Sequence, residues 1–370
     1  MPIVIQPYRQ EHESAVEAFN QRLRAATHDP DLVFYKSSNP KWLAKMEGSP
    51  LYNQYFVALE DGEVRGAYAL KYERFSRAGQ GEYTVACYHH PLSEGIINKS
   101  YSAVGSLLLR DAIWREPMLY ALGMGGLERP LPKMLKLLGW KLQFVPFYFR
   151  IVHPHRFLRQ MQVLRQPAWK RWLMDLGAYS GAGWLAVTAA QSVKRLGARF
   201  DKFESAVVDE FPEWTDGLWL EAKDEYELTS VRDRPTITRL HPSGDQNLTK
   251  LCVSRHGKPL GWAVVGERRK DPKYGSLRVG SVVDCWARSE NAAPVMLAAT
   301  QALQRQGMDL IVSNQSHKRW CQALEGCGFL PAESNFVFAT SKKHSALLQQ
   351  WEVSDSHLTR ANGDGLPRNF

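Results

Sequence analysis

The stretch "YFVALEDGEVRGAYAL" (55–70) contains two apolar runs joined by an Asp-Gly pair, which is typical of two strands and a tight hairpin turn. The stretch "KLCVSRHGKPLGWAVV" (250–265) has the same form. Gly62 and Gly257 lie at the two turns, 195 residues apart, and a further glycine follows four residues after each of them. The sequence therefore predicts one hairpin made twice, about half the chain length apart.

The same order of elements follows both hairpins. It consists of a strand with a cysteine, a helix, a short apolar strand, a helix closed by glycine and an aromatic residue, and a last strand. These elements fall at 82–88, 102–114, 118–122, 131–140 and 142–151 in the first half, and at 281–286, 292–306, 309–313, 320–329 and 335–340 in the second. Because the offsets drift as loop insertions would make them drift, we predict a duplicated unit, with each copy ending on its own last strand.

This order, together with "LGW" (138–140) and "CGF" (327–329), resembles the GNAT superfamily of acyl-CoA-dependent N-acyltransferases, arranged in tandem. The resemblance implies an α+β fold of two GNAT-like units, each a mixed, mostly antiparallel sheet flanked by helices and splayed between its fourth and fifth strands. We expect the N-terminal unit at 1–153, a basic helical linker at 154–200, the C-terminal unit at 201–345 and a C-terminal tail at 346–370. The end of the chain also resembles tails of FemAB-like and polysaccharide-cluster proteins.

The family binds the pyrophosphate of CoA at the start of the helix after the fourth strand, where free amides and the helix dipole favour an anion. The matching stretch in the first half, 100–106, keeps Gly105, although a capped helix start would also explain its small residues. In the second half Glu290 adds a carboxylate and Pro294 removes an N–H. The resemblance therefore implies an acyl-CoA site in the first half, formed by Cys87, Tyr88, Ser100, Ser102, Ala103, Val104, Gly105 and Ser106.

Acyl transfer to an amine needs a base and often an acid for the leaving thiolate. The similarity of "EYTVAC" to one branch of the family implies Glu82 as the base, with a solvated strand-end carboxylate as the alternative. Leucine stands in both halves where the family has a tyrosine acid, so Tyr88 and Tyr120 are substitute candidates, although core packing is an alternative for both. We interpret His89 and His90 as the beginning of a loop, with the lining of a substrate pocket as the alternative.

Composition sets limits on the class of protein. A chain of 370 residues with 44% hydrophobic residues is long enough for two full cores. The N-terminus has no secretory signal, and five scattered cysteines lack metal-site spacing, so we expect a cytoplasmic protein with buried thiols and no metal. The net charge is +9, but 156–200 holds eight Lys/Arg and one acidic residue. Neither half is therefore a basic module of the kind that binds DNA.

The basic segment 156–200 also includes an uncharged run, 176–193, that has the minimum length for a membrane span. Most of its residues are Ala, Gly, Ser, Thr and Gln, which insert poorly. Two interpretations stay open: a helical linker packed between the domains, or a helix lying on an anionic membrane surface.

We therefore expect an N-acyltransferase that uses acetyl-CoA or another acyl-CoA and acts on a small-molecule amine, such as an amino sugar in cell-surface polysaccharide synthesis. Two alternatives remain. A FemAB-like aminoacyl transferase would use charged tRNA in place of CoA, and a catalytically decayed tandem protein would serve as a binding or scaffold protein.

Overall fold

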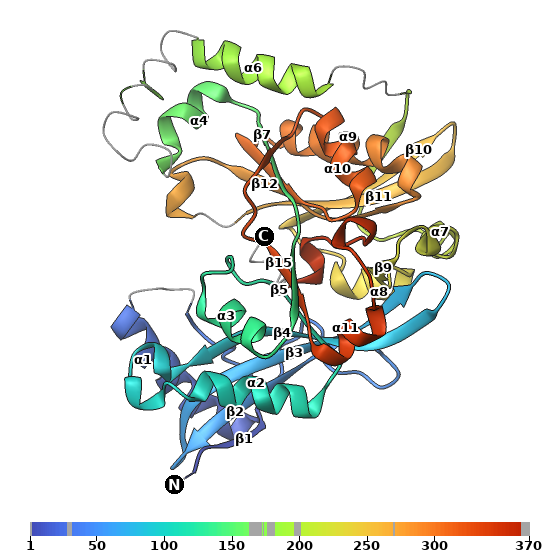
Figure 1. The fold of residues 1–370 in the computed structure, drawn as a ribbon. Helices are drawn as coiled ribbons and strands as arrows, with labels where there is room; N and C mark the ends of the chain where they lie inside the picture. Colours follow the sequence, from blue (N-terminus) through green and yellow to red (C-terminus); the bar gives the residue numbers. More distant parts are fainter. Residues whose placement is uncertain are drawn as a thin grey trace. The chain divides into compact units, whose positions relative to one another are not determined.

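The computed structural model describes residues 2–27, 32–162, 172, 174–175, 182–195, 201–268 and 271–363. The chain forms two compact units. Unit 1 consists of Met1–Phe75, Glu82–Gln143 and Val337–Trp351, and unit 2 consists of Ser76–Gly81, Phe144–Phe336 and Glu352–Phe370. Each unit has a mixed sheet with helices packed on it (Figure 1), as the sequence predicts.

The main strands of unit 1 follow the order β1 (Val4–Pro7), β2 (Tyr52–Glu60), β3 (Glu63–Arg77), β4 (Gly81–Ser93), β5 (Leu119–Gly123), β15 (Val337–Thr340) and β6 (Lys141–Phe144). Its helices are α1 (Glu13–Thr27), α2 (Val104–Arg115), α3 (Pro130–Leu137) and α11 (Lys342–Leu348). Strands β4 and β5 run parallel, whereas β1–β2, β2–β3 and β5–β15 are antiparallel. Apolar residues of α1 cover one face of the sheet, and those of α2 and α3 cover the other.

The sheet of unit 2 follows the order β14 (Leu330–Ala332), β7 (Phe147–Ile151), β13 (Leu310–Asn314), β12 (Val279–Ala287), β11 (Lys258–Glu267), β10 (Leu248–Arg255) and β8 (Glu204–Val208). The other elements of unit 2 are α4 (Pro154–Gln160), α6 (Ala182–Arg195), α7 (Trp214–Ala222), β9 (Leu228–Ser230), α8 (Arg234–Leu240), α9 (Ala292–Arg305) and α10 (Lys318–Gly326). Strands β12 and β13 are the parallel pair, at the place that β4 and β5 have in unit 1.

The two predicted hairpins are present and share their turn. Asp61 and Gly62 have φ of 52° and 79°, and His256 and Gly257 have φ of 50° and 75°. Positive φ at both central residues defines the two-residue turn that suits the twist of a hairpin. Each hairpin also shifts its register shortly before the turn, so the two copies share a bulge as well.

The second glycine of each hairpin allows a helix to approach the sheet closely. A Cβ atom on Gly66 would lie 2.7 Å from Cγ1 of Val104 in the first turn of α2. A Cβ atom on Gly261 would lie 2.7 Å from Cγ2 of Val295 in the first turn of α9. These distances are too short for a side chain, so both copies need glycine where the helix after the fourth strand begins.

The last strands of the two copies are exchanged, contrary to the prediction that each copy ends on its own strand. β7, which comes from the first half, pairs with β13 in unit 2, and β15, from the second half, pairs with β5 in unit 1. Pro146 lacks the N–H of a ladder residue and separates β6 from β7, so the stretch predicted as one strand can serve two sheets. The two units therefore cross the boundaries expected at 153 and 345.

The described part of the predicted linker packs within unit 2, where α6 lies beside α4 (Figure 1). The side-chain amide of Gln191 bonds both the N–H and the carbonyl of Ile151, at 2.8 and 3.1 Å, and Lys194 pairs with Glu325 at 3.0 Å. Residues 163–171, 173, 176–181 and 196–200 of the expected helical linker lie outside the described residues. Within the described ranges, the helices are too short or too polar to cross a membrane.

Candidate functional site

The parallel strands at the centre of each unit pair over only part of their length. In unit 1 the pairing of β4 with β5 is confined to Ala86 and Cys87, opposite Leu119 and Tyr120, while β4 continues to Ser93. In unit 2 the pairing of β12 with β13 ends at Val282, and β12 continues to Ala287. The predicted splay between the fourth and fifth strands is therefore present in both units.

The start of α2 offers backbone donors after β4. The first bond inside this helix runs from the N–H of Leu107 to the carbonyl of Ala103, at 3.1 Å. The amides of Val104, Gly105 and Ser106 therefore have no carbonyl acceptor within the helix. A Cβ atom on Gly105 would meet nothing within 4 Å, so space is open there. These amides and the helix dipole suit an anion such as a phosphate.

The serines predicted for the same site lie around these amides. Ser100 and Ser102 are exposed, and the N–H of Ser100 bonds the side chain of Asn98 at 3.0 Å. Ser106 is exposed, and its hydroxyl lies 3.5 Å from the sulfur of Met134. The structure thus brings the predicted segment 100–106 together at one helix start.

The equivalent helix start in unit 2 already holds a carboxylate. Glu225 accepts a hydrogen bond from the N–H of Ser289 at 2.8 Å and another from Nε of Arg288 at 2.9 Å. Ser289 opens the short 3-10 turn that leads into α9, and Pro294 is buried in the first turn of that helix. The chain's own acidic residue therefore takes the place that an anionic ligand would use.

The C-terminal tail contacts both sides of the splay in unit 2. Nε2 of His357 lies 3.9 Å from Sγ of Cys285 on β12. The N–H of Leu358 bonds the hydroxyl of Ser316, just beyond β13, at 2.7 Å, and the N–H of Ser316 bonds the carbonyl of Leu358 at 3.3 Å. All four side chains are buried. Residues of the chain itself thus line this gap and leave less room for a ligand.

In unit 1 a row of buried polar side chains crosses the sheet on the face covered by α1. Glu73 accepts a hydrogen bond from the Tyr120 hydroxyl at 2.5 Å and pairs with Nζ of Lys71 at 3.1 Å. Lys71 is the register partner of Asn53 on β2, and Tyr120 is the partner of Cys87 on β4. Burial and the neighbouring Cys87 and Glu73 raise the pKa of Tyr120 well above its usual range. We call Asn53, Lys71, Glu73 and Tyr120 the polar row; it extends from β2 to the edge of the gap between β4 and β5.

The structure brings Cys87 and Tyr88 to the point where β4 and β5 part, but it leaves Glu82 apart from them. Glu82 lies at the first residues of β4 and pairs with Arg74 at 2.8 Å. Tyr88 packs against Tyr68 on the α2 side, with ring centroids 5.4 Å apart, and burial raises its pKa. Its hydroxyl has no hydrogen-bond partner among the described residues.

Sequence reasoning missed Lys71 and Glu73, and it favoured the wrong structure for His89. Lys71 and Glu73 alternate in step with Ala67 and Ala69, which pack against α1, and this shared parity could have placed them on the buried face. His89 was expected in a loop, which is wrong: it lies within β4 and is buried. Burial, His90 and Lys71 together lower the pKa of His89 well below its usual value, so the imidazole is neutral.

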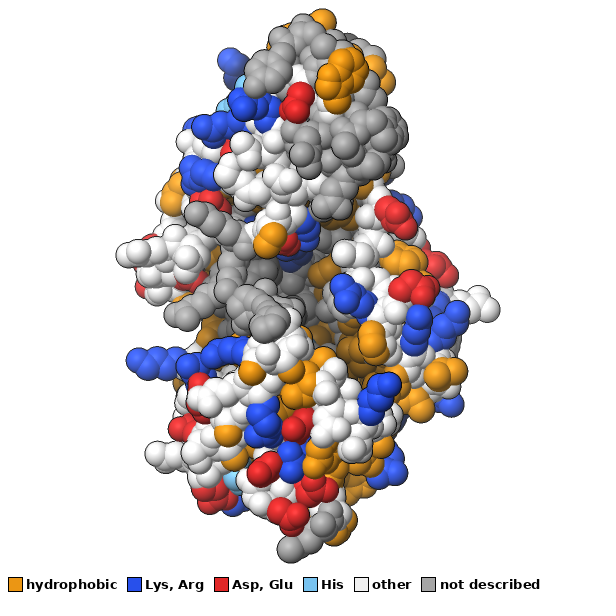
Figure 2. Space-filling view, turned by 90° about the vertical axis from the view of Figure 1, so that its left-hand side faces the viewer, with side chains coloured by type: hydrophobic (Ala, Val, Ile, Leu, Met, Phe, Trp, Pro, Cys, Tyr) orange, Lys and Arg blue, Asp and Glu red, His pale blue; other side chains and the backbone are white. Residues whose placement is uncertain are grey.

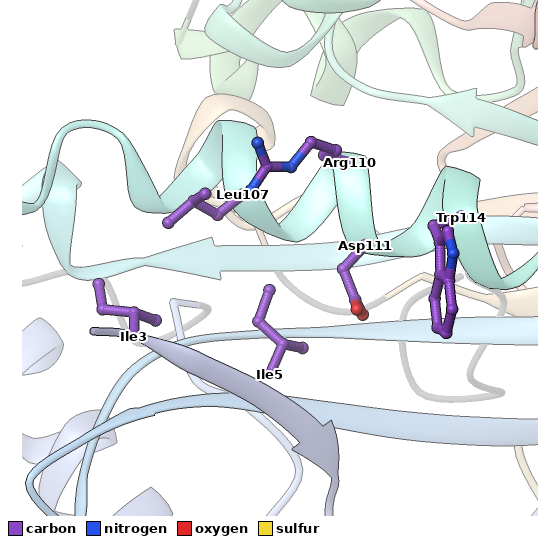
Figure 3. Close-up of a pocket in the computed structure, with 6 residues that line it drawn as sticks. All are labelled: Ile3, Ile5, Leu107, Arg110, Asp111 and Trp114. Atoms are coloured by element: carbon purple, nitrogen blue, oxygen red, sulfur yellow. The ribbon is translucent and has the colours of Figure 1, made fainter. Parts of the chain in front are cut away.

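Two hollows adjoin the sheet of unit 1. One, of about 340 Å³, lies between β1 and α2 (Figure 3). Its Asp111 carboxylate is held by the hydroxyl of Tyr68 at 2.5 Å and by Nε of Arg115 at 2.7 Å, so its charge is already satisfied. The other, of about 310 Å³, lies on the α1 side and includes Asn53, at the end of the polar row. Among the described lining residues, the second hollow thus shares Asn53 with the polar row, whereas the first shares none of that row's residues.

Comparison with known proteins shows which fold this is. No family model and no curated protein matches the sequence. Saccharomyces cerevisiae N-myristoyltransferase, solved with bound myristoyl-CoA and inhibitors, matches with a TM-score of 0.57 and 10% identity over 97% of this chain and 88% of that one. A probable N-acyltransferase from Enterococcus faecalis matches with a TM-score of 0.52 and 9% identity over 95% of this chain and 75% of that one. A GCN5-related N-acetyltransferase from Anabaena variabilis matches with a TM-score of 0.52 and 12% identity over 91% of this chain and 72% of that one.

These matches span both units of the chain. They confirm the predicted fold, that of GNAT-type N-acyltransferases with two mixed α+β units in one chain.

Proposed function

We propose that this protein is an acyl-CoA-dependent N-acyltransferase that acts on a small amine, and that unit 1 binds the donor. The observation that carries the proposal is the open start of α2, whose free amides follow a strand that parts from its neighbour beyond Cys87. The fold shared with solved N-acyltransferases, one of them holding myristoyl-CoA, supports an acyl-CoA as the donor.

In this proposal the amides of Ala103, Val104, Gly105 and Ser106 receive the pyrophosphate, with the hydroxyls of Ser100 and Ser102 beside them. Cys87 and Tyr88 border the gap that would take the thioester arm. We propose no acyl-CoA site in unit 2. Glu225 accepts the N–H of Ser289 at the start of the equivalent helix, and the C-terminal tail lines the gap between β12 and β13. Acetyl-CoA and longer acyl-CoAs are both candidate donors.

The polar row supplies the acid and the base. The bound ammonium first releases a proton to water, and the neutral amine then attacks the thioester carbonyl carbon. As the C–N bond forms and the C–S bond breaks, the nitrogen gives its proton to the Glu73 carboxylate. The CoA thiolate takes the proton of Tyr120, which recovers one from Glu73 through their 2.5 Å hydrogen bond. Lys71 holds the Glu73 carboxylate in place.

Glu73 thus takes the role that the sequence suggested for Glu82, and of the two tyrosines that the sequence suggested as the acid, Tyr120 is preferred to Tyr88. Glu82 is five residues before the last paired residue of β4, about 16 Å along the strand, and it is bound to Arg74. Tyr88 lies on the opposite face from Glu73, where its hydroxyl can border the donor. The proposal therefore retains Tyr88 as a donor contact and moves the proton transfer to the α1 side.

Calorimetry with acetyl-CoA, a long-chain acyl-CoA and charged tRNA, followed by a thiol-release assay with mixed amines, tests this function. We expect micromolar binding of one acyl-CoA and amine-dependent release of thiol. Salt-sensitive binding of tRNA alone would favour the aminoacyl-transferase alternative. On the face shown in Figure 2, acidic and basic side chains are interspersed over the described surface, which does not favour RNA. Binding without turnover would favour a decayed scaffold protein.

The proposal extends to the acceptor and the place of action. The acceptor class expected from the sequence is an amino sugar used in cell-surface polysaccharide synthesis, in the cytoplasm at the inner surface of the membrane. The polar hollow beside Asn53 is the part of unit 1 that would receive it.

A second function, contact with an anionic membrane, is favoured by α6. This helix turns Gln191 and Lys194 toward unit 2, whereas Trp184 and Leu185 are 53% and 62% exposed. An apolar outer face within a segment that is rich in Lys and Arg suits the surface of an anionic bilayer. The alternative is that α6 serves only to cover unit 2.

Liposome flotation separates these two roles of α6. We expect the protein to float with vesicles that contain phosphatidylserine at low salt, and Trp184→Ser/Leu185→Ser to reduce the bound fraction. Trp114→Ser is the control, because Trp114 is 77% exposed on α2 in unit 1. Equal flotation of all three proteins, or none with any vesicle, would leave α6 as a packing element.

A further inference from the structure

We infer that Asn53, Tyr55 and His89 form the recognition surface for an uncharged, polyhydroxylated part of the acceptor, such as the ring of an amino sugar. This inference deepens the proposed function and rests on it, because the bound ligand is the acceptor of the acyl group only in an acyltransferase. Packing does not explain several buried polar side chains of unit 1, which have no hydrogen-bond partner among the described residues.

Asn53 is 5% exposed and His89 is 4% exposed. Neither polar atom of the Asn53 amide and neither ring nitrogen of His89 has a hydrogen-bond partner in the described part of the chain. The Tyr55 hydroxyl is also without a hydrogen bond of good geometry there, although the Asn53 amide lies beside it. Burial raises the pKa of Tyr55 to about 12 despite the opposing effect of that amide. A buried polar group without a partner costs free energy, so these groups are kept for another reason.

Asn20 shows how the same unit treats an asparagine that has a structural role. Its side chain is fully buried, donates to the carbonyl of Phe34 at 3.0 Å and accepts from the N–H of Phe34 at 2.7 Å. Asn20 thus satisfies both ends of its amide within the chain. Asn53 satisfies neither, which distinguishes a group that awaits a ligand from one that holds the fold.

The unbonded groups lie on one face of the sheet. Asn53 and Tyr55 line the hollow of about 310 Å³ on the α1 side. His89 lies on β4, next to β3, and the charge of Lys71 on β3 contributes to the lowered pKa of His89; Lys71 is the register partner of Asn53. The ligand therefore enters over β2 and reaches toward Glu73, the base of the proposed reaction.

The character of the lining selects the ligand. An amide, a phenol and a neutral imidazole each offer donors and acceptors without a net charge, which suits hydroxyl groups. Lys71 and Glu73 neutralise each other, and among the described residues Lys45 is the one charged residue that lines the hollow. Tyr8, Pro7 and Pro40 add flat apolar walls, and the C–H faces of a sugar ring pack well on such surfaces. The volume is at the small end for ligand pockets and fits one ring.

The test compares three probes by calorimetry on the full chain without CoA, so that it does not depend on acyl transfer. The probes are glucosamine, which has both hydroxyls and an amine, N-acetylglucosamine, which lacks the free amine, and 1,4-diaminobutane, which lacks hydroxyls. We expect glucosamine to bind at least tenfold more tightly than diaminobutane. Tighter binding of diaminobutane, or no binding of glucosamine at millimolar concentration, would overturn the inference.

Variants connect this binding to the unbonded groups. Asn53→Leu and Tyr55→Phe should each weaken glucosamine binding about tenfold, while the melting temperature stays equal or rises, because each removes a buried group that has no partner. His89→Leu should do the same. Asn20→Leu is the control and should lower the melting temperature, because it breaks two bonds to Phe34. Loss of stability in Asn53→Leu comparable to that in Asn20→Leu would contradict a ligand-binding role.

The outcomes for the inference and for the proposed function are separable. Glucosamine binding that depends on Asn53, without any thiol release from acyl-CoA, would uphold the recognition surface and refute the acyltransferase. Thiol release with diaminobutane but not with glucosamine would uphold the acyltransferase and refute the recognition surface.

Discussion

The hydroxyl of Tyr120 on β5 donates a 2.5 Å hydrogen bond to the carboxylate of Glu73 on β3, across the intervening strand β4. Tyr120 is also the residue opposite Cys87, the last residue of β4 that pairs with β5. A proton can therefore pass between the α1 side of the sheet and the edge of the gap without leaving the protein. This connection makes Glu73 and Tyr120 the first residues to test.

We predict that Tyr120→Phe and Glu73→Gln each slow amine-dependent thiol release by about 100-fold or more and leave acyl-CoA affinity unchanged, the range usual for an acid or base. Glu73→Gln also leaves the buried Lys71 ammonium without its carboxylate, which destabilises a fold by about 3–5 kcal/mol. The double variant Lys71→Met/Glu73→Gln should recover the melting temperature but not the rate. Recovery of both would mean that Glu73 only stabilises the fold.

Glu82→Gln decides between the two glutamates. If proton transfer takes place on the α1 side, this variant should keep nearly full turnover, because Glu82 contacts Arg74 and not the polar row. A rate loss of about 100-fold in Glu82→Gln, with an active Glu73→Gln, would instead support the base that the family resemblance suggested. Thiol release and CoA titration on the two variants in parallel are sufficient.

Gly105→Glu should abolish acyl-CoA binding to unit 1, because it places an anion beside the amides of Val104 and Ser106. The matched variant is Gly105→Gln, which has nearly the same shape and no charge. Space around Gly105 is open and the residue is helical, so neither variant should lower the melting temperature. We expect Gln to weaken binding far less than Glu in calorimetry with CoA. Unchanged affinity in both variants would place the donor elsewhere.

The duplicated glycine makes a prediction about stability. In Gly261→Ala, the new Cβ would lie 2.5 Å from the carbonyl oxygen of Trp286 and 2.7 Å from Val295, so we expect a loss of about 1–3 kcal/mol in the free energy of unfolding. Gly217→Ala in α7 meets nothing within 4 Å and should gain about 0.5–1 kcal/mol. Urea denaturation measures both. Equal effects would show that the contact between α9 and the sheet relaxes easily.

The sequence predicted the elements better than their pairing. The hairpins at 55–70 and 250–265 carry local signals, because an Asp-Gly or His-Gly turn and alternating residues act over a few positions. The exchange of β7 and β15 depends on which sheet offers a free edge, and an apolar run carries no such information. Pro146 was the one local sign that the predicted strand 142–151 would break.

The residues of the candidate site could be recognised from the sequence only in part, for a similar reason. The helix start at 100–106 follows from a motif that is continuous in sequence, and the structure places it at the start of α2. The polar row joins Asn53, Glu73 and Tyr120 from three strands, and no spacing in the sequence relates them. Only the alternation of Lys71 and Glu73 with Ala67 and Ala69 pointed to a buried charge pair.

Buried histidines make the stability of the protein depend on pH. Burial lowers the pKa of His344 to about 4, although its bond to the carbonyl of Leu119 opposes this, and burial together with Lys318 lowers the pKa of His317 to about 4. The unfolded chain therefore binds protons below pH 6.5 that the folded chain does not bind until about pH 4. Stability is complete above pH 6.5 and falls as the pH decreases through this window.

We expect each histidine to contribute a loss on the order of 3 kcal/mol between pH 6.5 and 4. His344→Gln keeps a polar side chain near Leu119 and Tyr83 but cannot titrate, so it should flatten the dependence of the free energy of unfolding on pH. His256→Asn is the control, because His256 is exposed at a hairpin turn with positive φ, which asparagine tolerates. Urea denaturation at pH 4.5, 5.5 and 7 measures the slope, and an unchanged slope in His344→Gln would show that His344 binds protons equally in the folded and the unfolded chain.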